Sequence, residues 1–295
     1  MHDMKQESKQ QEKPEWLKVT YSQKKVDQMN TLLSGLNLNT VCAEANCPNL
    51  GECFGSGTAA FMILGPNCTR ACRFCDVPHG HPRPVDLAEP LHVAQAAKRL
   101  GLSHIVVTSV DRDDLPDLGA DQFVQTIKAL RQITPETTIE VLTPDFQGKT
   151  EQLDKIIAAE PDVFNHNMET VRSITPKVRH RATYATSLRV LQYVKEHAST
   201  KTFVKTGIML GLGEKDAEVY QLMDDLRDIN IDFLTIGQYV QPSAKHYQLR
   251  EWVPLERYQK YYHEAKIRGF KFIASSPLVR SSYKAKEELL AVYGK

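Results

Sequence analysis

Three cysteines lie close together in the segment CTRACRFC, at Cys68, Cys72 and Cys75. Their C-x3-C-x2-C spacing supplies three thiolates, whereas structural metal sites are usually closed by four protein ligands and working sites keep one position open. Three thiolates can hold three irons of a [4Fe–4S] cluster and leave the fourth iron free for a small ligand. The segment therefore predicts a reducing cluster with one exchangeable position.

Zinc is the alternative interpretation of this segment. His79 and His81 follow the last cysteine closely and could complete a Cys3His site. However, the spacing of the three cysteines is unusual for zinc. We therefore favour the cluster and expect both histidines to be ordinary loop residues.

A second group of cysteines, Cys42, Cys47 and Cys53, has the spacing C-x4-C-x5-C, and no cysteine follows Cys75. Disulfide-rich chains are usually small and secreted, whereas this chain has 295 residues and shows no secretory signal at its start. The cysteines therefore indicate metal ligands. A second cluster is the natural interpretation, and its fourth ligand must be another residue type.

The composition argues against several kinds of partner. The net charge is +1, so the sequence shows no basic footprint for nucleic acid. No apolar run approaches the ~18 residues that a membrane span requires. The first residues are polar and charged, so we expect a cytoplasmic protein that binds neither nucleic acid nor membrane.

Short apolar runs, rich in β-branched residues, alternate with amphipathic helical segments. The runs are residues 59–65, 104–109, 138–144, 162–167, 203–210, 232–238 and 271–275. The helical segments are residues 91–101, 120–132, 152–160, 186–197, 217–229 and 255–269. This alternation predicts an α/β fold in which helices surround a parallel sheet. We expect a TIM-like (β/α) barrel, full or partial, with six units and a seventh strand.

The three-cysteine loop follows the first of these runs, at the end of a strand where (β/α) barrels carry their chemistry. We expect four parts of the chain: a flexible N-terminal extension (1–20), a further extension with the second cysteine group (21–57), the barrel (58–275) and a C-terminal extension (276–295).

C-x3-C-x2-C with an aromatic residue, Phe74, before the last cysteine resembles the signature of the radical S-adenosylmethionine (SAM) superfamily. A narrower resemblance, to the lipoyl synthase family, covers about residues 35 to 285. It rests on CAEANCPNLGECF (42–54), TSVDRDDLPD (108–117), FNHNMETV (164–171), LTIGQYVQPSAKH (234–246) and VRSSYKA (279–285). The chain departs from that family at DLGA (117–120), SSP (275–277) and KTG (205–207), none of which is a cluster ligand.

The resemblance implies the ligands of two [4Fe–4S] clusters. The open iron of the first would bind the amino and carboxylate groups of SAM. Ser282, with Ser281 as the alternative, would join the second cysteine group around an auxiliary cluster, closed by the C-terminal extension. A serine oxygen is a harder ligand than thiolate, so its iron should be the easiest to lose, which suits a cluster that the family consumes.

The resemblance also implies further contacts. Cofactor contacts are expected at Phe74, Asn165, Asn167, Glu169, Gly211 and Gly213, and substrate contacts at Arg179 and Arg181. The acidic segment DRDD (111–114) could contact the cofactor amino group or a substrate lysine, or be a solvated loop. No conventional catalytic acid or base is expected, because the cofactor and the clusters carry the chemistry.

The implied reaction is insertion of two sulfur atoms at C6 and C8 of a protein-bound N6-octanoyl-lysine, which gives lipoyl-lysine. Two adenosyl radicals would remove hydrogen, and the auxiliary cluster would donate the sulfur. The implied partners are an octanoylated lipoyl carrier domain, of glycine cleavage H protein or a 2-oxoacid dehydrogenase E2, and an electron donor such as flavodoxin or ferredoxin.

Two other interpretations remain open at this point. One is a different two-cluster, sulfur-inserting radical enzyme of the biotin synthase kind, which the second cysteine group and the RSSY segment disfavour. The other is a non-catalytic iron–sulfur or zinc protein. Two incomplete cysteine triads disfavour it, because a structural site would be closed.

Overall fold

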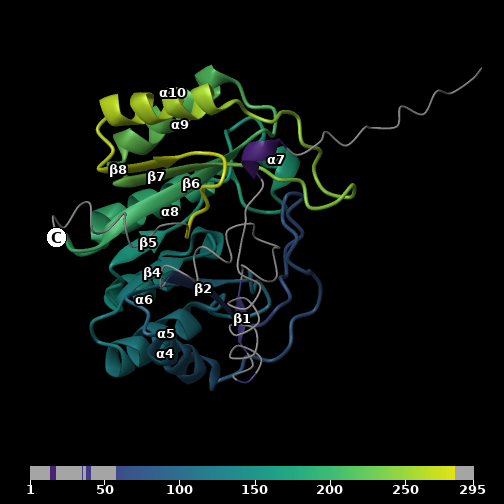
Figure 1. Cartoon of the computed structure of the whole chain (residues 1–295). Coiled ribbons are helices and arrows are strands. Elements are labelled where there is room, and N and C mark those ends of the chain that lie inside the picture. Colours follow the sequence, from purple (N-terminus) through teal and green to yellow (C-terminus); the bar gives the residue numbers. More distant parts are fainter. Residues whose placement is uncertain (1–13, 18–34, 36–37, 41–57, 283–295) are drawn as a thin grey trace, which may run out of the picture.

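The computed structural model describes residues 14–17, 35, 38–40 and 58–282 (Figure 1). The second cysteine group, Cys42, Cys47 and Cys53, lies outside the described residues, as do most of the two N-terminal extensions and the last part of the C-terminal one. The described part contains the predicted barrel, and the boundaries of the four parts stay predictions.

One sheet runs through the described part, with its strands in sequence order. Seven strands are parallel: β2 (Thr58–Ile63), β3 (His104–Ser109), β4 (Thr138–Leu142), β5 (Val163–Asn165), β6 (Phe203–Leu210), β7 (Phe233–Gln238) and β8 (Phe272–Ser275). A short strand, β1 (Asn39–Thr40), pairs antiparallel with β2. Within the described residues β8 pairs with β7 alone, so the sheet is an open, partial barrel, as expected.

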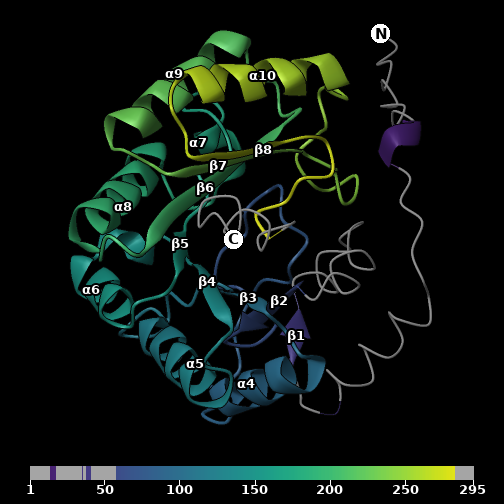
Figure 2. The same ribbon diagram turned by 60° about the vertical axis from the view of Figure 1, so that its left-hand side comes forward.

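Six helices cover the outer side of the curved sheet (Figure 2). They are α4 (Glu89–Leu100), α5 (Ala120–Ile133), α6 (Thr150–Ala158), α8 (Tyr184–His197), α9 (Asp216–Asp228) and α10 (Leu255–Ile267). Each turns an apolar stripe inward, and the strands beneath are nearly continuous apolar runs, as expected for a parallel sheet covered by helices. Local signals set some ends: α4 stops at Gly101, whose φ of 61° is the left-handed C-cap conformation.

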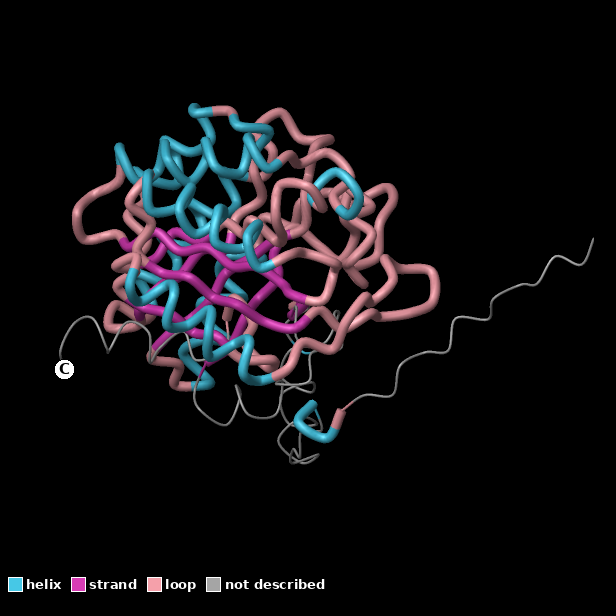
Figure 3. Tube along the Cα trace, turned by 90° about the horizontal axis from the view of Figure 1, so that it is seen from above, coloured by secondary structure: helices cyan, strands magenta, loops and turns pink. Residues whose placement is uncertain are grey.

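The long loops gather at the carboxyl ends of the strands (Figure 3). One loop joins β2 to α4 and carries the three cysteines. The loop after β4 contains a short 3-10 helix, η2 (Phe146–Gly148), and the loop after β5 contains a one-turn helix, α7 (Thr175–Val178). Neither short element was predicted, because one turn leaves no periodic pattern to detect. A further 3-10 helix, η1 (Glu15–Leu17), lies near the N-terminus.

The segment after β8 crosses the carboxyl ends of β6 and β7, and two strand glycines make room for it. A Cβ atom on Gly237 would clash with the Val279 carbonyl oxygen. A Cβ on Gly207 would lie 2.5 Å from Thr235 Oγ1 and 3.3 Å from Ser281 Oγ. Glycine within a strand commonly marks such a close backbone approach. The crossing brings the C-terminal serines over the mouth of the barrel.

No helix in the described part of the chain combines the length and the apolar character that a bilayer span requires.

Candidate active site

A cavity of about 510 Å³ opens at the carboxyl ends of the strands. This volume lies within the usual range for small-molecule sites, about 300–1,000 Å³. Its walls come from the loops after β2, β3, β4, β5 and β7 and from the segment after β8. They include Cys68, Cys72, Phe74, Cys75, Ser109, Asp111, Thr143, His166, Asn167, Glu169, Arg179, Ser281 and Ser282.

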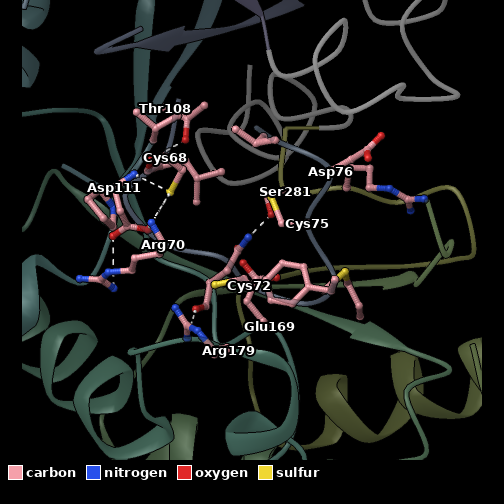
Figure 4. Close-up of a pocket in the computed structure, with 18 of the residues that line it drawn as sticks. Cys68, Arg70, Cys72, Cys75, Asp76, Thr108, Asp111, Glu169, Arg179 and Ser281 are labelled. Atoms are coloured by element: carbon pink, nitrogen blue, oxygen red, sulfur yellow. Dashed lines mark hydrogen bonds and ion pairs between the residues drawn. The ribbon is translucent and has the colours of Figure 1, made fainter. Parts of the chain in front are cut away.

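The loop that carries Cys68, Cys72 and Cys75 points all three side chains into this cavity (Figure 4). Cys68 Sγ accepts the backbone N–H groups of Arg70 and Asp111, at 3.4 Å and 3.3 Å. The Cys75 N–H donates to the Cys72 carbonyl at 3.1 Å, which tightens the second half of the loop. Three residues expected as ligands of one cluster therefore share one concave wall.

Burial alone disfavours the thiolate form of these cysteines. It raises the pKa of Cys68 to about 11 and that of Cys75 to about 12, and it also raises the pKa of Cys72. A coordinating metal removes the proton from a thiol outright. Three partly buried thiols on one wall therefore fit a metal cluster, whose positive irons would stabilise the thiolates.

The geometry does not support a zinc site. In the described part of the chain, no group of three or more His, Cys, Asp or Glu side chains is arranged to hold a metal ion. His79 and His81 are exposed and do not line the cavity. Zinc needs all its ligands about 2.0–2.3 Å from one centre. A four-iron cluster is wider, so thiolates that bind different corners of it stand further apart.

A buried arginine, which no sequence motif predicted, holds the cysteine loop. The guanidinium of Arg70 makes two hydrogen bonds to Asp113, at 2.8 Å and 2.7 Å. It also pairs with Asp111 at 3.2 Å and with Asp145 at 2.9 Å. The carboxylates come from the loops after β3 and β4, so DRDD is a structural anchor rather than a solvated loop. The sequence did contain a signal for this network: Arg70 lies between two cysteines, and aspartates follow two of the predicted strands.

Asn167, Glu169 and Arg179 lie together beside Cys72. Asn167 and Arg179 are joined by a bond from Arg179 Nη1 to the Asn167 carbonyl at 3.3 Å. Burial raises the pKa of Glu169, and the charge of Arg179 and a hydrogen bond from Asn167 oppose that rise. Glu169 also has a φ of 67°, a left-handed conformation that non-glycine residues rarely adopt. Where it does occur, it is often found at functional sites.

Two other expected contacts are placed differently. Asn165 is buried but does not line the cavity, and its amide donates to Glu140 Oε1 at 2.7 Å. Arg181 is exposed, and its guanidinium pairs with Asp113 at 3.2 Å. Both positions follow from tertiary contacts that a motif cannot reveal, and neither side chain forms part of the cavity wall.

Gly211 and Gly213 also lie off the cavity wall. Gly211 has a φ of 96°, and a Cβ there would clash with Gln238 Nε2 and would lie 2.5 Å from the Glu251 carbonyl oxygen. The close approach at Gly211 is therefore to protein backbone and side chain, and the glycine is explained by packing of the loop after β6.

Several polar side chains of the wall have unused hydrogen-bonding atoms. Ser109 Oγ, Thr143 Oγ1 and Arg179 Nε are buried and have no hydrogen-bond partner among the described residues. Buried polar atoms are normally satisfied, so such a group at a cavity wall indicates a polar ligand. A hydroxyl-rich, zwitterionic molecule such as SAM fits this wall.

The fold and the site define a radical SAM enzyme. A family model described as the radical SAM superfamily matches residues 62–226, more than half of the chain, and the match includes the three-cysteine loop. Among solved structures, SuiB of Streptococcus suis bound to S-adenosylmethionine shares the fold. Its TM-score is 0.59 at 10% identity, over 75% of this chain and 50% of SuiB.

Comparison with curated proteins narrows the family. A lipoyl synthase of Caldanaerobacter subterraneus subsp. tengcongensis is 52% identical over 273 residues, 92% of this chain and 95% of that protein. The mitochondrial lipoyl synthase of Nematostella vectensis is 50% identical over 278 residues, 94% of this chain and 95% of that protein. The chain belongs to the lipoyl synthase family.

Family membership confirms the expected function and cofactors. The chain is a radical SAM sulfurtransferase of lipoate biosynthesis, and its cofactors are SAM and [4Fe–4S] clusters. The two other interpretations, an enzyme of the biotin synthase kind and a non-catalytic metal protein, are thereby set aside. Which residues hold each group is a separate question.

Proposed function

We propose that Cys68, Cys72 and Cys75 hold the SAM-binding cluster and that Ser282 joins Cys42, Cys47 and Cys53 around the auxiliary, sulfur-donating cluster. The observation that carries this proposal is that the three thiols and Ser282 line the same cavity. An octanoyl group bound in this cavity would therefore lie near both the source of the radical and the source of sulfur.

Ser281 and Ser282 differ in a way that favours Ser282 as the ligand. The Ser281 hydroxyl donates to Asn167 Oδ1 at 2.9 Å. Its oxygen also packs against the backbone of β6 at Gly207. The Ser282 side chain lines the cavity and has no hydrogen-bond partner among the described residues. Its oxygen is therefore available to a metal, whereas that of Ser281 is engaged.

The protein residues bind, orient and shield in this proposal. When bound, the SAM cluster and SAM supply the electron and the carbon-centred radical that removes hydrogen from an unreactive chain. Asn167, Glu169 and Arg179 would hold the polar groups of the cofactor, and Phe74 would cover it. Exclusion of water from the cavity once cofactor and substrate are bound would protect reactive species from side reactions.

The substrate would be the octanoylated lysine of a lipoyl carrier domain, from glycine cleavage H protein or a 2-oxoacid dehydrogenase E2. A flavodoxin or a ferredoxin would provide electrons. We expect a cytoplasmic protein, although one relative carries the word mitochondrial in its name. Asn165, Gly211, Gly213 and Arg181, which do not line the cavity, are not assigned direct contacts.

Iron content tests the two cluster sites. Anaerobically reconstituted protein should hold about eight irons per chain, and replacement of Cys42, Cys47 and Cys53 by alanine should leave about four, as expected for two four-iron clusters. Equal iron in both proteins would contradict the auxiliary site.

Product assays separate the roles further. Cys68→Ala should abolish formation of 5′-deoxyadenosine, whereas Cys47→Ala should retain it and lose lipoyl product. Ser282→Ala should lose lipoyl product with 5′-deoxyadenosine still formed, and Ser281→Ala is the matched control that should keep most turnover. Full turnover by Ser282→Ala would exclude this serine as the ligand.

A further inference from the structure

An exposed, positively charged surface lies on the outer side of the cysteine loop. It consists of Arg73, Lys177 and Arg250 around the buried ring of Tyr247, and we call it the outer cationic surface. The guanidinium carbons of Arg73 and Arg250 lie 5.3 Å and 5.8 Å from the centroid of that ring. Two positive side chains are thus gathered at one aromatic residue.

Backbone contacts fix this arrangement. The Arg73 N–H donates to the Val178 carbonyl at 2.7 Å, and the Tyr247 N–H donates to the Arg73 carbonyl at 2.7 Å. Arg73 Nη1 also donates to the Lys177 carbonyl at 3.3 Å. The end of α7 and the loop before α10 are therefore both attached to the cysteine loop at Arg73.

Direct ion pairs do not hold the charges of this surface within the described part of the chain. None of its three cations forms an ion pair with a described carboxylate, whereas some other exterior cations do, such as Lys260 with Asp216 at 3.0 Å and Lys271 with Asp232 at 2.7 Å. Like charges held close together destabilise the fold. An acidic partner from outside the chain would remove that repulsion.

The position of this surface separates it from the cavity. Cys72 and Cys75 turn their side chains to the cavity, while Arg73, between them in sequence, is exposed. Neither Arg73, Lys177 nor Arg250 lines the cavity wall. His246 also contacts the cysteine loop from this side, since its Nε2 lies 3.1 Å from the Cys75 carbonyl oxygen. A protein bound here would lie one loop away from the cluster ligands and would leave the cavity mouth open.

We propose that a small acidic electron-carrier protein docks on the outer cationic surface and reduces the cluster through the cysteine loop. This inference rests on the proposed cluster at Cys68, Cys72 and Cys75. In the step, the carrier loses one electron and the cluster gains it, with no bond formed or broken. Electron transfer slows steeply with the distance between donor and acceptor, so a carrier docked directly outside the cysteine loop would transfer its electron fastest. The octanoylated carrier domain has a different requirement, because its lysine must reach into the cavity.

Reduced flavodoxin is the probe for this surface. Stopped-flow absorbance would follow its oxidation by cluster-loaded enzyme with SAM and without any octanoylated substrate. The triple variant Arg73→Gln, Lys177→Gln, Arg250→Gln should be reduced about tenfold more slowly at low salt and should show a weaker salt dependence, because steering by charge is lost. Dithionite, which needs no docking, should reduce the variant and the native enzyme equally.

The matched control carries the same change of charge elsewhere. Lys98→Gln, Arg99→Gln, Lys128→Gln neutralises three exposed cations on α4 and α5, and its reduction by flavodoxin should equal that of the native enzyme. Equal rates for the triple variant and this control would overturn the proposal. A separate turnover assay gives a second outcome that would overturn it: a raised KM of the triple variant for the octanoylated carrier, with unchanged flavodoxin oxidation. That result would mean that the substrate protein binds this surface.

A second variant guards against damage to the cluster loop. Lys177→Gln, Arg250→Gln leaves Arg73 intact and should still slow flavodoxin alone. Slower reduction by dithionite as well would assign these residues to the cluster site and overturn docking. Because no octanoylated carrier is present, the result is independent of lipoyl product formation. Loss of dithionite reduction in the native enzyme would instead count against the proposed cluster.

Discussion

The protein contains two largely buried ion-pair networks, one in the loops at the cavity and one within the sheet, and they are built differently. At the cavity, Arg70 is surrounded by three carboxylates, those of Asp111, Asp113 and Asp145. Below the cavity, one carboxylate, Glu140, faces one ammonium, Lys205, at 3.3 Å. Among the described residues named here, the first network has more carboxylates than cations, whereas the second has one charge of each sign.

Exposure explains the difference. The side chain of Asp111 is 21% exposed, and Asp113 also bonds the exposed Arg181. Glu140 and Lys205 are 1% and 0% exposed, so no water is available to solvate an extra charge. Two further side chains contact Glu140: the Asn165 amide donates to it, and His104 Nε2 lies 3.7 Å from the same carboxylate.

The two networks therefore do different work. The Glu140–Lys205 pair links β4 to β6 across Asn165 of β5, which fixes the spacing of strands beneath the cavity. The Arg70 network links three loops and fixes the cysteine loop above them. Burial even raises the pKa of Asp111 to about 6, while bonds from Arg70 lower that of Asp113 to about 2. The partly exposed mouth tolerates such unequal carboxyl groups, whereas full burial in the core favours a carboxylate paired with a cation.

The largest effect should come from Lys205→Met. It leaves the Glu140 carboxylate buried without its cation, and breaking a buried pair in this way costs about 3–5 kcal/mol. Urea unfolding would measure the loss. Lys195→Met is the control, because Lys195 is partly exposed and its partner Asp232 keeps Lys271 at 2.7 Å. A loss no larger than that of the control would contradict the role given to the core pair.

An intermediate effect should appear as pH dependence at His166, beside the Arg70 network. Burial, aided by the charge of Arg179, lowers the pKa of His166 from 6.5 to about 4. The unfolded chain takes up a proton below pH 6.5, and the folded protein does so only near pH 4. The contribution of neutral His166 to the free energy of unfolding is therefore complete above pH 6.5. This contribution, on the order of 3 kcal/mol, is lost as the pH falls from 6.5 to 4.

Unfolding midpoints measured anaerobically at several pH values in that window would show this slope. His166→Asn should flatten it, because the titrating ring is gone while a side-chain amide can still donate to the Thr143 carbonyl that His166 Nδ1 contacts at 2.9 Å. An unchanged slope in the variant would assign the pH dependence to other groups.

The smallest effect should come from Arg70→Lys. One ammonium cannot reproduce the two-pronged bond to Asp113 together with the contacts to Asp111 and Asp145. We expect a loss of about 1–3 kcal/mol and faster loss of iron from the reconstituted protein. Arg131→Lys, at a partly exposed pair with Asp162, is the control and should change neither quantity by much. Normal iron retention in Arg70→Lys would separate this network from the cysteine loop.

The alternation of apolar runs and amphipathic segments predicted the sheet, its strand order and the six outer helices, because these patterns are local. It could not show whether the barrel closes, since closure depends on pairing between distant strands. The motifs predicted the loop of Cys68, Cys72 and Cys75, and the structure places all three on one wall. The resemblance named Asn167, Glu169 and Arg179, which line the cavity, but also Asn165 and Gly211, which do not.

The sequence by itself predicted the kind of chemistry, because the number and spacing of the thiolates in one short segment favour an open iron–sulfur cluster. Tertiary structure alone decided which polar side chains reach the cavity. Asn165 and Asn167 are two residues apart, yet one bonds Glu140 in the core and the other bonds Ser281 at the mouth. Arg70 became an anchor only when the loops after β3 and β4 brought carboxylates to it. Such roles depend on neighbours distant in sequence, and only the folded chain brings those neighbours together.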